Sequence, residues 1–316
     1  KYNYMFSLIF PGQGSQTVGM CKEFYNKFDV VKNIFKSADE ILNFPISKLI
    51  FEGPKEELNL TENTQPAIFL VGHTIFTILT REFQFDVSKS LFFAGHSLGE
   101  YTALNSAGFI NFEDTIKILK IRGKAMQSSV PKGEGGMIAV LGSKIEFVEN
   151  LLEQNKNNYK CFIANDNSDG QLVLSGKKKD LEKLSLDLKK NSIKNISLPV
   201  SAPFHCELME KATEVMKSEI KNLNINTTNK ILISNVTGKP MNDPEDIKKL
   251  LISQIESRVR WRESIKYMIE NGTKGFIEIG PGKVLSGLVK RIDKNIKLNA
   301  INSEEDITIL KNNYEL

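Results

Sequence analysis

The segment LFFAGHSLGEY, residues 91–101, places a serine between two glycines directly after a short apolar run. The apolar run is typical of a buried strand, and the small residues after 101 are typical of a helix. Gly95, Ser97 and Gly99 fit the pattern G-x-S-x-G, in which a serine occupies a sharp turn between a strand and a helix. The segment therefore predicts a strand, a tight turn and a helix, with Ser97 as a candidate nucleophile.

The residues before and after this turn extend the same alternation. MFSLIF (5–10) is predicted to be a buried strand that stops at Pro11-Gly12, and helices are predicted around 20–42, 65–81 and 116–127. Strands that alternate with helices indicate an α/β fold with a mainly parallel sheet. The Gly-rich segment FPGQGSQTVGM (10–20) would then lie at the carboxyl edge of the sheet, close to Ser97.

The middle of the chain has a different order. Strands are predicted at 137–142, 161–165, 171–176 and 193–200, and helices at 144–155 and 177–190. The order β-α-β-β-α-β is typical of a ferredoxin-like module. We therefore predict that residues 130–197 form an inserted ferredoxin-like subdomain, while 1–129 and 198–316 form the catalytic domain.

Composition limits the classes of function. The chain has 316 residues, 41% of them hydrophobic, and no apolar run long enough to span a membrane. The formal net charge of +4 is too small to indicate a nucleic-acid partner, but it suits an acidic protein. Three cysteines and three histidines without a CxxC pair argue against a metal site and indicate a reducing compartment.

A serine nucleophile needs a base, and the chain offers three histidines. His96 neighbours Ser97 in sequence, so its side chain should point away, and His73 lies in an apolar helical stretch typical of a core. His205, in LPVSAPFHCELM between a predicted strand and a helix, is the base by elimination. The group that orients it stays open between a backbone carbonyl and the acids Asp166, Asp169 and Glu207.

Two further features bear on the chemistry. The helix after the turn directs its free N–H groups at Ser97, so the N–H of Leu98 is a predicted oxyanion donor. The Gly-rich segment 10–20 is either a structural turn or a functional loop, and in the second case Gln13 would help to form the oxyanion hole. Segment 10–20 fits neither a P-loop nor G-x-G-x-x-G, which argues against a nucleotide site. Arg122 interrupts an apolar helical face, where it either snorkels to water or binds a substrate carboxylate through two hydrogen bonds.

Several stretches together carry a family resemblance: FPGQGSQTVGM (10–20), TQPA (64–67), GHSLGEY (95–101), RGKAMQ (122–127), GGMIAVLG (135–142), APFHCELM (202–209), SNVTG (234–238), VRW (259–261) and EIGPGKVLSGLVKRI (278–292). In this order and spacing the chain resembles malonyl-CoA:acyl carrier protein transacylases of type II fatty-acid synthesis. It is also similar to the acyltransferase domains of polyketide and fatty-acid synthases.

The resemblance implies an α/β-hydrolase-like core with a ferredoxin-like insert. Ser97 would carry the acyl group, His205 would be its base, oriented by a backbone carbonyl, and Arg122 would bind the malonyl carboxylate. The backbone N–H groups of Leu98 and Gln13 would form the oxyanion hole. The resemblance implies no metal or cofactor, malonyl-CoA and an acidic, transiently bound acyl carrier protein as substrates, and a monomer. Further pocket residues would be Gln65, His96, Phe204 and Gln254.

The resemblance also has local consequences. Phe204 corresponds to the malonyl-selective form of its loop, because a bulky ring leaves little room for an α-methyl group. Asp169 and Arg258 stand where the family commonly has proline. Carrier docking is expected at a basic cluster, with three candidates. They are Lys177-Lys178-Lys179, Lys189-Lys190 and Lys290-Arg291. The chain begins with Lys1, so a removed targeting segment would fit a plastid-type organelle, with the cytoplasm as the default otherwise.

Two rival functions remain at this stage. A serine esterase or thioesterase also has G-x-S-x-G, although it has no evident use for Arg122. A catalytically silent module that docks a carrier protein is the second rival. Intact Ser97, His205 and Arg122 argue against the silent module.

Overall fold

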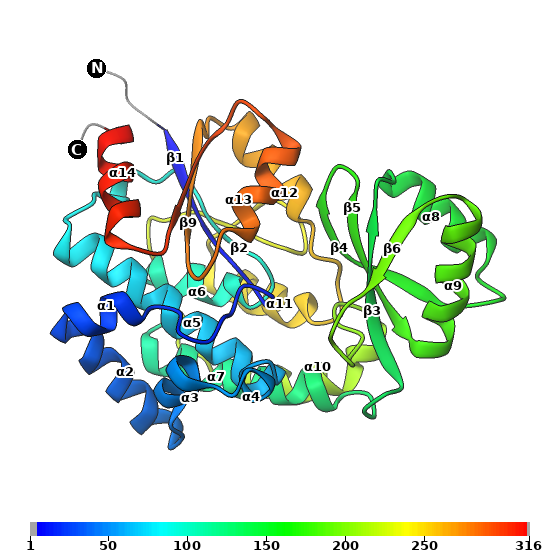
Figure 1. Cartoon of the computed structure of the whole chain (residues 1–316), viewed down its shortest axis with the longest axis horizontal. Coiled ribbons are helices and arrows are strands. Elements are labelled where there is room, and N and C mark those ends of the chain that lie inside the picture. The colour runs from blue at the N-terminus through cyan, green and yellow to red at the C-terminus, as the bar shows by residue number, and fades with distance from the viewer. Residues whose placement is uncertain (1–4, 315–316) are drawn as a thin grey trace.

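The computed structural model describes residues 5–314, which form two sheets (Figure 1). The larger sheet has the strand order β10-β9-β1-β2-β7-β8, and its pairs are parallel except for β7 with β8. Its strands are β1 (Phe6–Phe10), β2 (Phe93–Gly95), β7 (Leu232–Ile233), β8 (Pro240–Met241), β9 (Gly275–Ile279) and β10 (Lys297–Ile301). The predicted mixed α/β fold with a mainly parallel sheet is confirmed.

Helices cover both faces of this sheet, and its central strands β1, β2 and β9 are therefore buried throughout. In β1 every residue is buried: Leu8 and Phe10 face one hydrophobic cluster, and Ile9 faces another. The core helices are α1 (Lys22–Lys27), α2 (Asp29–Leu42), α3 (Ile46–Glu52), α4 (Lys55–Leu58), α5 (Thr61–Thr77), α6 (Gly99–Ser106), α7 (Phe112–Ser128), α10 (Glu210–Lys221), α11 (Pro244–Gln254), α12 (Trp261–Glu270), α13 (Val284–Ile292) and α14 (Glu304–Tyr314).

Two predicted helices differ in detail from those observed. The helix expected over 20–42 is divided into α1 and α2 at Phe28, whose backbone is extended with φ −115° and ψ 121°. The helix expected over 65–81 begins earlier, at Thr61, and ends in a π-helical turn, Ile78–Glu82. Within residues 5–314, no helix is long and apolar enough to cross a membrane.

The second sheet is antiparallel and has the order β4-β5-β3-β6. Its elements are β3 (Gly135–Leu141), α8 (Ile145–Gln154), β4 (Cys161–Ser168), β5 (Gln171–Lys177), α9 (Lys178–Lys190) and β6 (Lys194–Ser197). This β-α-β-β-α-β order is the ferredoxin-like order predicted from the sequence. We refer to residues 130–197 as the insert and to the remainder as the core. The exact limits remain a prediction, and residues 1–4 and 315–316 of the predicted catalytic domain lie outside the described part.

The last strand of the insert is shorter than predicted. The sequence indicated a strand over 193–200, whereas β6 ends at Ser197. Pro199 has no N–H to donate to a ladder, so the sheet pairing stops before it. Leu198 and Val200 line a cavity that also contains Ser97.

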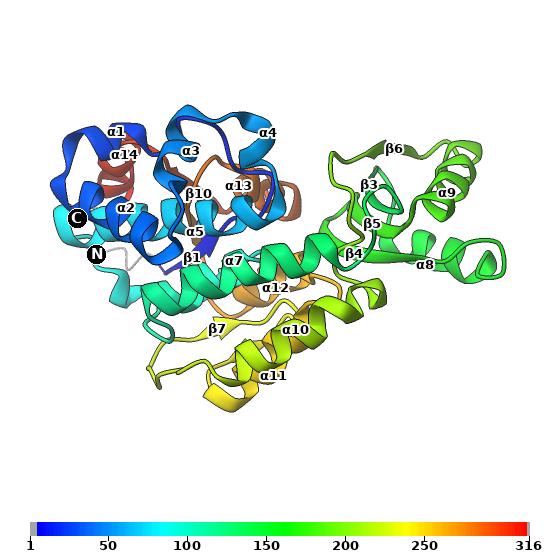
Figure 2. The same ribbon diagram turned by 90° about the horizontal axis from the view of Figure 1, so that it is seen from below.

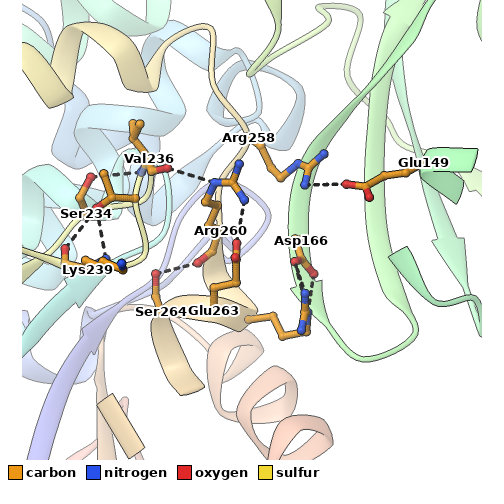
Figure 3. Close-up of polar contacts among 11 residues, drawn as sticks. Glu149, Asp166, Ser234, Val236, Lys239, Arg258, Arg260, Glu263 and Ser264 are labelled. Atoms are coloured by element: carbon orange, nitrogen blue, oxygen red, sulfur yellow. Dashed lines mark hydrogen bonds and ion pairs between the residues drawn. The ribbon is translucent and has the colours of Figure 1, made fainter. Parts of the chain in front are cut away.

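The insert is joined to the core along strand β4. Asn165 forms a parallel bridge with Val259, and two backbone bonds of 2.9 and 2.7 Å hold this contact. Next to it, Arg262 of α12 binds both carboxylate oxygens of Asp166, at 2.8–3.2 Å, with the Asp166 side chain 1% exposed (Figure 3). Figure 2 shows α7 running from the core toward the insert. The orientation of the two subdomains is thus fixed by strand pairing and a buried ion pair.

The two departures from the family's sequence pattern also lie at this junction. Arg258 forms an ion pair with Glu149 of α8 at 3.0 Å (Figure 3), and Asp169 lies 3.8 Å from Lys266 of α12. Each pair joins an insert residue to a core residue. Charged residues at these two positions therefore add contacts across the junction.

We predict that Asp166→Asn lowers the free energy of unfolding by about 3 kcal/mol, because it leaves the largely buried Arg262 guanidinium without its anion. Urea denaturation measures this change. Asp169→Asn is the matched control, since its more exposed pair should contribute under about 1 kcal/mol. Equal stability of the two variants would show that the buried pair does not hold the insert in place.

Candidate active site

Ser97 lies in a strained turn between β2 and α6. Its φ of 55° is in the left-handed region, which costs a non-glycine residue about 1–3 kcal/mol. The glycines on either side are required by packing. A Cβ on Gly95 would lie 1.8 Å from the carbonyl oxygen of Gly99, and a Cβ on Gly99 would lie 2.3 Å from that of Phe10. The G-x-S-x-G spacing therefore reflects close backbone contacts around the serine.

Ser97 and His205 lie together, as the sequence predicted. The Oγ of Ser97 is 2.8 Å from Nε2 of His205, and Nδ1 of His205 donates to the backbone carbonyl of Gln254 at 3.0 Å. His205 also has a left-handed backbone, with φ 59°. Of the orienting groups left open above, the structure places the carbonyl at the imidazole. The three acids form ion pairs elsewhere: Asp166 with Arg262, Asp169 with Lys266 and Glu207 with Lys160.

The protonation of His205 suits a general base. Burial and the neighbouring Arg122 cation lower the pKa of His205 to about 3. The imidazole is therefore neutral over the whole ordinary pH range and can accept the Ser97 proton.

Arg122 lies next to the Ser97–His205 pair, which we call the dyad, and its side chain does not extend to water. Its side chain is fully buried, with Nη1 donating to Gln65 Oε1 and Nη2 to Gln254 Oε1, both at 2.8 Å. Nη2 also lies 3.4 Å from Ser97 Oγ. Within residues 5–314 no carboxylate forms an ion pair with Arg122. A buried cation usually has an anionic partner, so this guanidinium is suited to bind an anion brought to Ser97.

The buried acid Glu100, whose charge acts on Arg122, is mostly neutral near pH 7. Glu100 is fully buried, accepts a hydrogen bond from the backbone N–H of Asn235 and contacts Gln254 Nε2. Burial raises the pKa of Glu100 to about 8, so most of it is protonated at pH 7. The positive charge of Arg122 therefore remains available to a ligand.

A cavity of about 180 Å³ opens above the serine. Five further predicted residues line it, namely Gln13, Gln65, His96, Leu98 and Phe204, whereas Arg122 and Gln254 are not among its lining residues. No hydrogen bond within the described residues uses the backbone N–H of Gln13 or Leu98. Both N–H groups are thus available for the oxyanion role predicted for them.

The other two histidines form their hydrogen bonds with residues other than Ser97. His96 Nε2 contacts Asn167 Oδ1 of the insert at 2.7 Å, and its ring packs on Trp261, with 5.5 Å between centroids. His73 Nδ1 contacts Asn105 Oδ1 at 2.8 Å, as expected of a core histidine. His96 therefore supports the junction between core and insert.

Sequence reasoning did not assign a role to Asn235 or Glu100. Asn235 lies 138 residues after Ser97, yet its Oδ1 accepts the backbone N–H of Ser97 at 2.8 Å. Its segment SNVTG contributed only to the family resemblance. Glu100 directly follows the turn at residues 95–99, which we call the elbow. An acidic residue in the first turn of a helix is usually exposed, so the sequence did not indicate that Glu100 is buried.

We predict that the rate of Ser97 labelling by a fluorophosphonate changes less than about twofold between pH 7 and pH 5. The lowered pKa of His205 keeps its imidazole neutral throughout this range. A histidine with the ordinary pKa near 6.5 would instead lose labelling roughly tenfold per pH unit below that value, and this fall would contradict the assignment. His205→Ala should label slowly at both pH values.

Acidification also lowers the stability of the folded protein through His205. The unfolded chain protonates His205 near pH 6.5, whereas the folded chain does so only near pH 3. The unfolded state therefore binds more protons between these values, and stability falls as the pH decreases from 6.5. Circular dichroism at each pH confirms that labelling is measured on folded protein.

Comparison with known proteins agrees with this geometry. Residues 7–310 match the acyl transferase domain family. The malonyl CoA-acyl carrier protein transacylase of Bacillus subtilis (strain 168) is 42% identical over 305 residues, which cover 96% of this chain and 95% of that protein.

Solved structures give the same result. The acyl-carrier-protein S-malonyltransferase from Bartonella henselae has a TM-score of 0.95 at 40% identity, covering 99% of this chain and 100% of its own. A malonyl transacylase in complex with a type II polyketide acyl carrier protein has a TM-score of 0.94 at 34% identity, covering 98% and 99%. The chain therefore belongs to the acyl transferase domain family and, within it, to the malonyl CoA-acyl carrier protein transacylases.

Proposed function

We propose that this acyltransferase moves a malonyl group from malonyl-CoA to the phosphopantetheine thiol of an acyl carrier protein, through an ester on Ser97. The observation that carries the proposal is the buried Arg122 guanidinium, which lies 3.4 Å from Ser97 Oγ without a carboxylate partner among residues 5–314. A malonyl group attached to Ser97 has a free carboxylate that Arg122 can bind through two hydrogen bonds. An acetyl group has none.

In the first half-reaction, His205 Nε2 accepts the Ser97 proton as Oγ attacks the thioester carbonyl. The carbonyl oxygen becomes an oxyanion, for which the N–H groups of Leu98 and Gln13 are available. The C–S bond then breaks, the departing sulfur accepts the proton from His205, and CoA leaves as the free thiol. A malonyl ester remains on Ser97. One oxyanion donor of this kind typically contributes about 10²–10³ in rate.

The second half-reaction is the reverse with a different thiol. The carrier's phosphopantetheine thiol gives its proton to His205 and attacks the ester carbonyl, and Ser97 Oγ leaves with that proton. Because the CoA product departs before the carrier binds, the kinetics are ping-pong. The Gln254 carbonyl holds the imidazole in one tautomer throughout, with Nδ1 protonated.

The esterase alternative uses the same dyad with water as the acceptor. It gives no reason to bury an unpaired cation beside the nucleophile, because a neutral acyl group does not repay the cost of desolvating arginine. Phe204 lines the cavity, and we propose that its ring limits α-substituted acyl groups there. The absence of a cofactor and the monomeric state remain expectations from the resemblance, and the compartment remains an expectation from the sequence.

We predict that intact-protein mass spectrometry after mixing with malonyl-CoA shows one malonyl adduct, and little adduct with acetyl-CoA. Ser97→Ala should carry neither. Arg122→Ala should lose the preference for malonyl over acetyl, because no cation remains for the carboxylate.

Other outcomes discriminate the rivals. CoA release without a retained adduct would indicate hydrolysis and favour the esterase. Neither adduct nor CoA release would indicate a silent module. An Arg122→Ala variant that keeps its malonyl preference would contradict the role given to Arg122.

The carrier is proposed to dock beside α9 of the insert. Lys178 and Lys189 line a groove of about 540 Å³ that shares Met137, Leu198 and Val200 with the cavity of Ser97. The groove therefore adjoins the route by which a pantetheine arm would reach the serine. Its lysines suit an acidic partner. The cluster Lys290-Arg291 lies at the far end of α13, whose first residues line the same cavity.

We predict that the double charge reversal Lys178→Glu with Lys189→Glu raises KM for the carrier about tenfold and leaves Ser97 loading by malonyl-CoA unchanged. The matched control is Lys32→Glu with Lys36→Glu, a pair of exposed lysines on α2, distant from the insert in Figures 1 and 2. An unchanged KM for the carrier in the α9 variant would exclude this groove. If only charge reversal at Lys290-Arg291 raises this KM, the docking site lies at α13 instead.

A further inference from the structure

Asn235 contacts the backbone on both sides of the nucleophile. Its Oδ1 accepts the N–H of Ser97 at 2.8 Å, and its Nδ2 donates to the carbonyl of Gly95 at 2.7 Å. The side chain has no exposed surface. Because one partner is a donor and the other an acceptor, the amide orientation is fixed. Only a side chain with both a donor and an acceptor at this length can make the two bonds.

The segment that carries Asn235 is itself held firmly. The backbone carbonyl of Asn235 accepts the backbone N–H of Arg260 at 2.9 Å, while Arg260 Nε donates to the carbonyl of Val236 at 3.1 Å. Arg260 is oriented in turn by Glu263 at 2.9 Å, and Ser234 caps the turn through the N–H of Val236 (Figure 3). Asn235 is therefore presented to the elbow from an anchored loop.

The same amide links the two halves of the dyad. Gln254 Nε2 lies 3.3 Å from Asn235 Oδ1 and donates to the carbonyl of Ser97 at 3.0 Å. The backbone carbonyl of Gln254 orients His205. The backbone N–H of Asn235 donates to the buried Glu100 at 3.1 Å. A change at Asn235 would therefore reach Ser97 directly and His205 through one intervening residue.

We infer that Asn235 is a positioning residue for the nucleophile: its amide holds Ser97 in the left-handed conformation and occupies the Ser97 N–H, so that the N–H of Leu98 faces the oxyanion instead. Residues in such conformations persist when surrounding contacts over-determine them, and the two bonds from Asn235 do so here. Asn235 touches neither acyl group nor thiol in this account. The inference rests on the proposed use of Ser97 as nucleophile.

The test measures the reactivity of Ser97 independently of any acyl donor. Fluorophosphonate labelling of Asn235→Ala should be about 100-fold slower than that of the parent, because small displacements of a reacting group cost about this factor. KM for malonyl-CoA should stay within threefold, since Arg122 and Gln65 keep their contacts. Asn235→Asp retains the acceptor for Ser97 but loses the donor to Gly95, and should label about tenfold slower.

Asn105→Ala is the matched control. Asn105 lies on α6 and also bonds through both ends of its amide, to His73 and to the carbonyl of Ile110, but away from Ser97. It should label within twofold of the parent at a temperature where all variants are folded by circular dichroism. Labelling of both Asn235 variants within threefold of the parent would overturn the inference. A parent that labels but accepts no malonyl group would contradict only the proposed function.

Discussion

The left-handed backbone of Ser97 is the constraint on which the site depends. It projects Oγ toward His205 from a turn between a buried strand and a helix. It requires glycine on both sides, because Gly95 packs on the backbone of Gly99 and Gly99 packs on the end of β1. The cost of this conformation is offset by contacts from remote parts of the core, notably Asn235 and Gln254. The elbow is therefore formed by the tertiary structure, and its five-residue motif is only the part visible in sequence.

Around this turn one ionisable side chain is charged and its ionisable neighbours are neutral. Burial lowers the pKa of His205 and raises that of Glu100, so both groups tend to be neutral near pH 7. Arg122 is then the main local charge, fully buried and held by two glutamine oxygens. Neutral amide oxygens orient the guanidinium but do not cancel its charge. An anionic acyl group would complete the site, which gives a physical basis for the selectivity proposed here.

The sequence identified the parts of the site that need unusual residue types. Only three histidines were available, and loop position separated His205 from the other two; Arg122 stood out on an apolar face. The carbonyl of Gln254 could not be singled out, because every residue has a carbonyl. Asn235 was equally hidden, because its partner Ser97 is distant in sequence.

In the fold, too, features set by the local sequence pattern were predictable, and features set by contacts between distant segments were not. The order of strands and helices along the insert followed from the alternation of apolar runs, whereas the end of β6 depended on Pro199 and on side chains that turn to line the cavity. The break between α1 and α2 at Phe28 has no proline or glycine to mark it. The ion pairs of Asp169 and Arg258 across the junction depend on which elements meet there.

A crystal structure of the protein after exposure to malonyl-CoA would test the central claim most directly. The account predicts continuous density from Ser97 Oγ to a malonyl ester, with its free carboxylate on the Arg122 guanidinium and its carbonyl oxygen near the N–H groups of Leu98 and Gln13. An ester whose carboxylate points to solvent, with Arg122 bound only to Gln65 and Gln254, would contradict it.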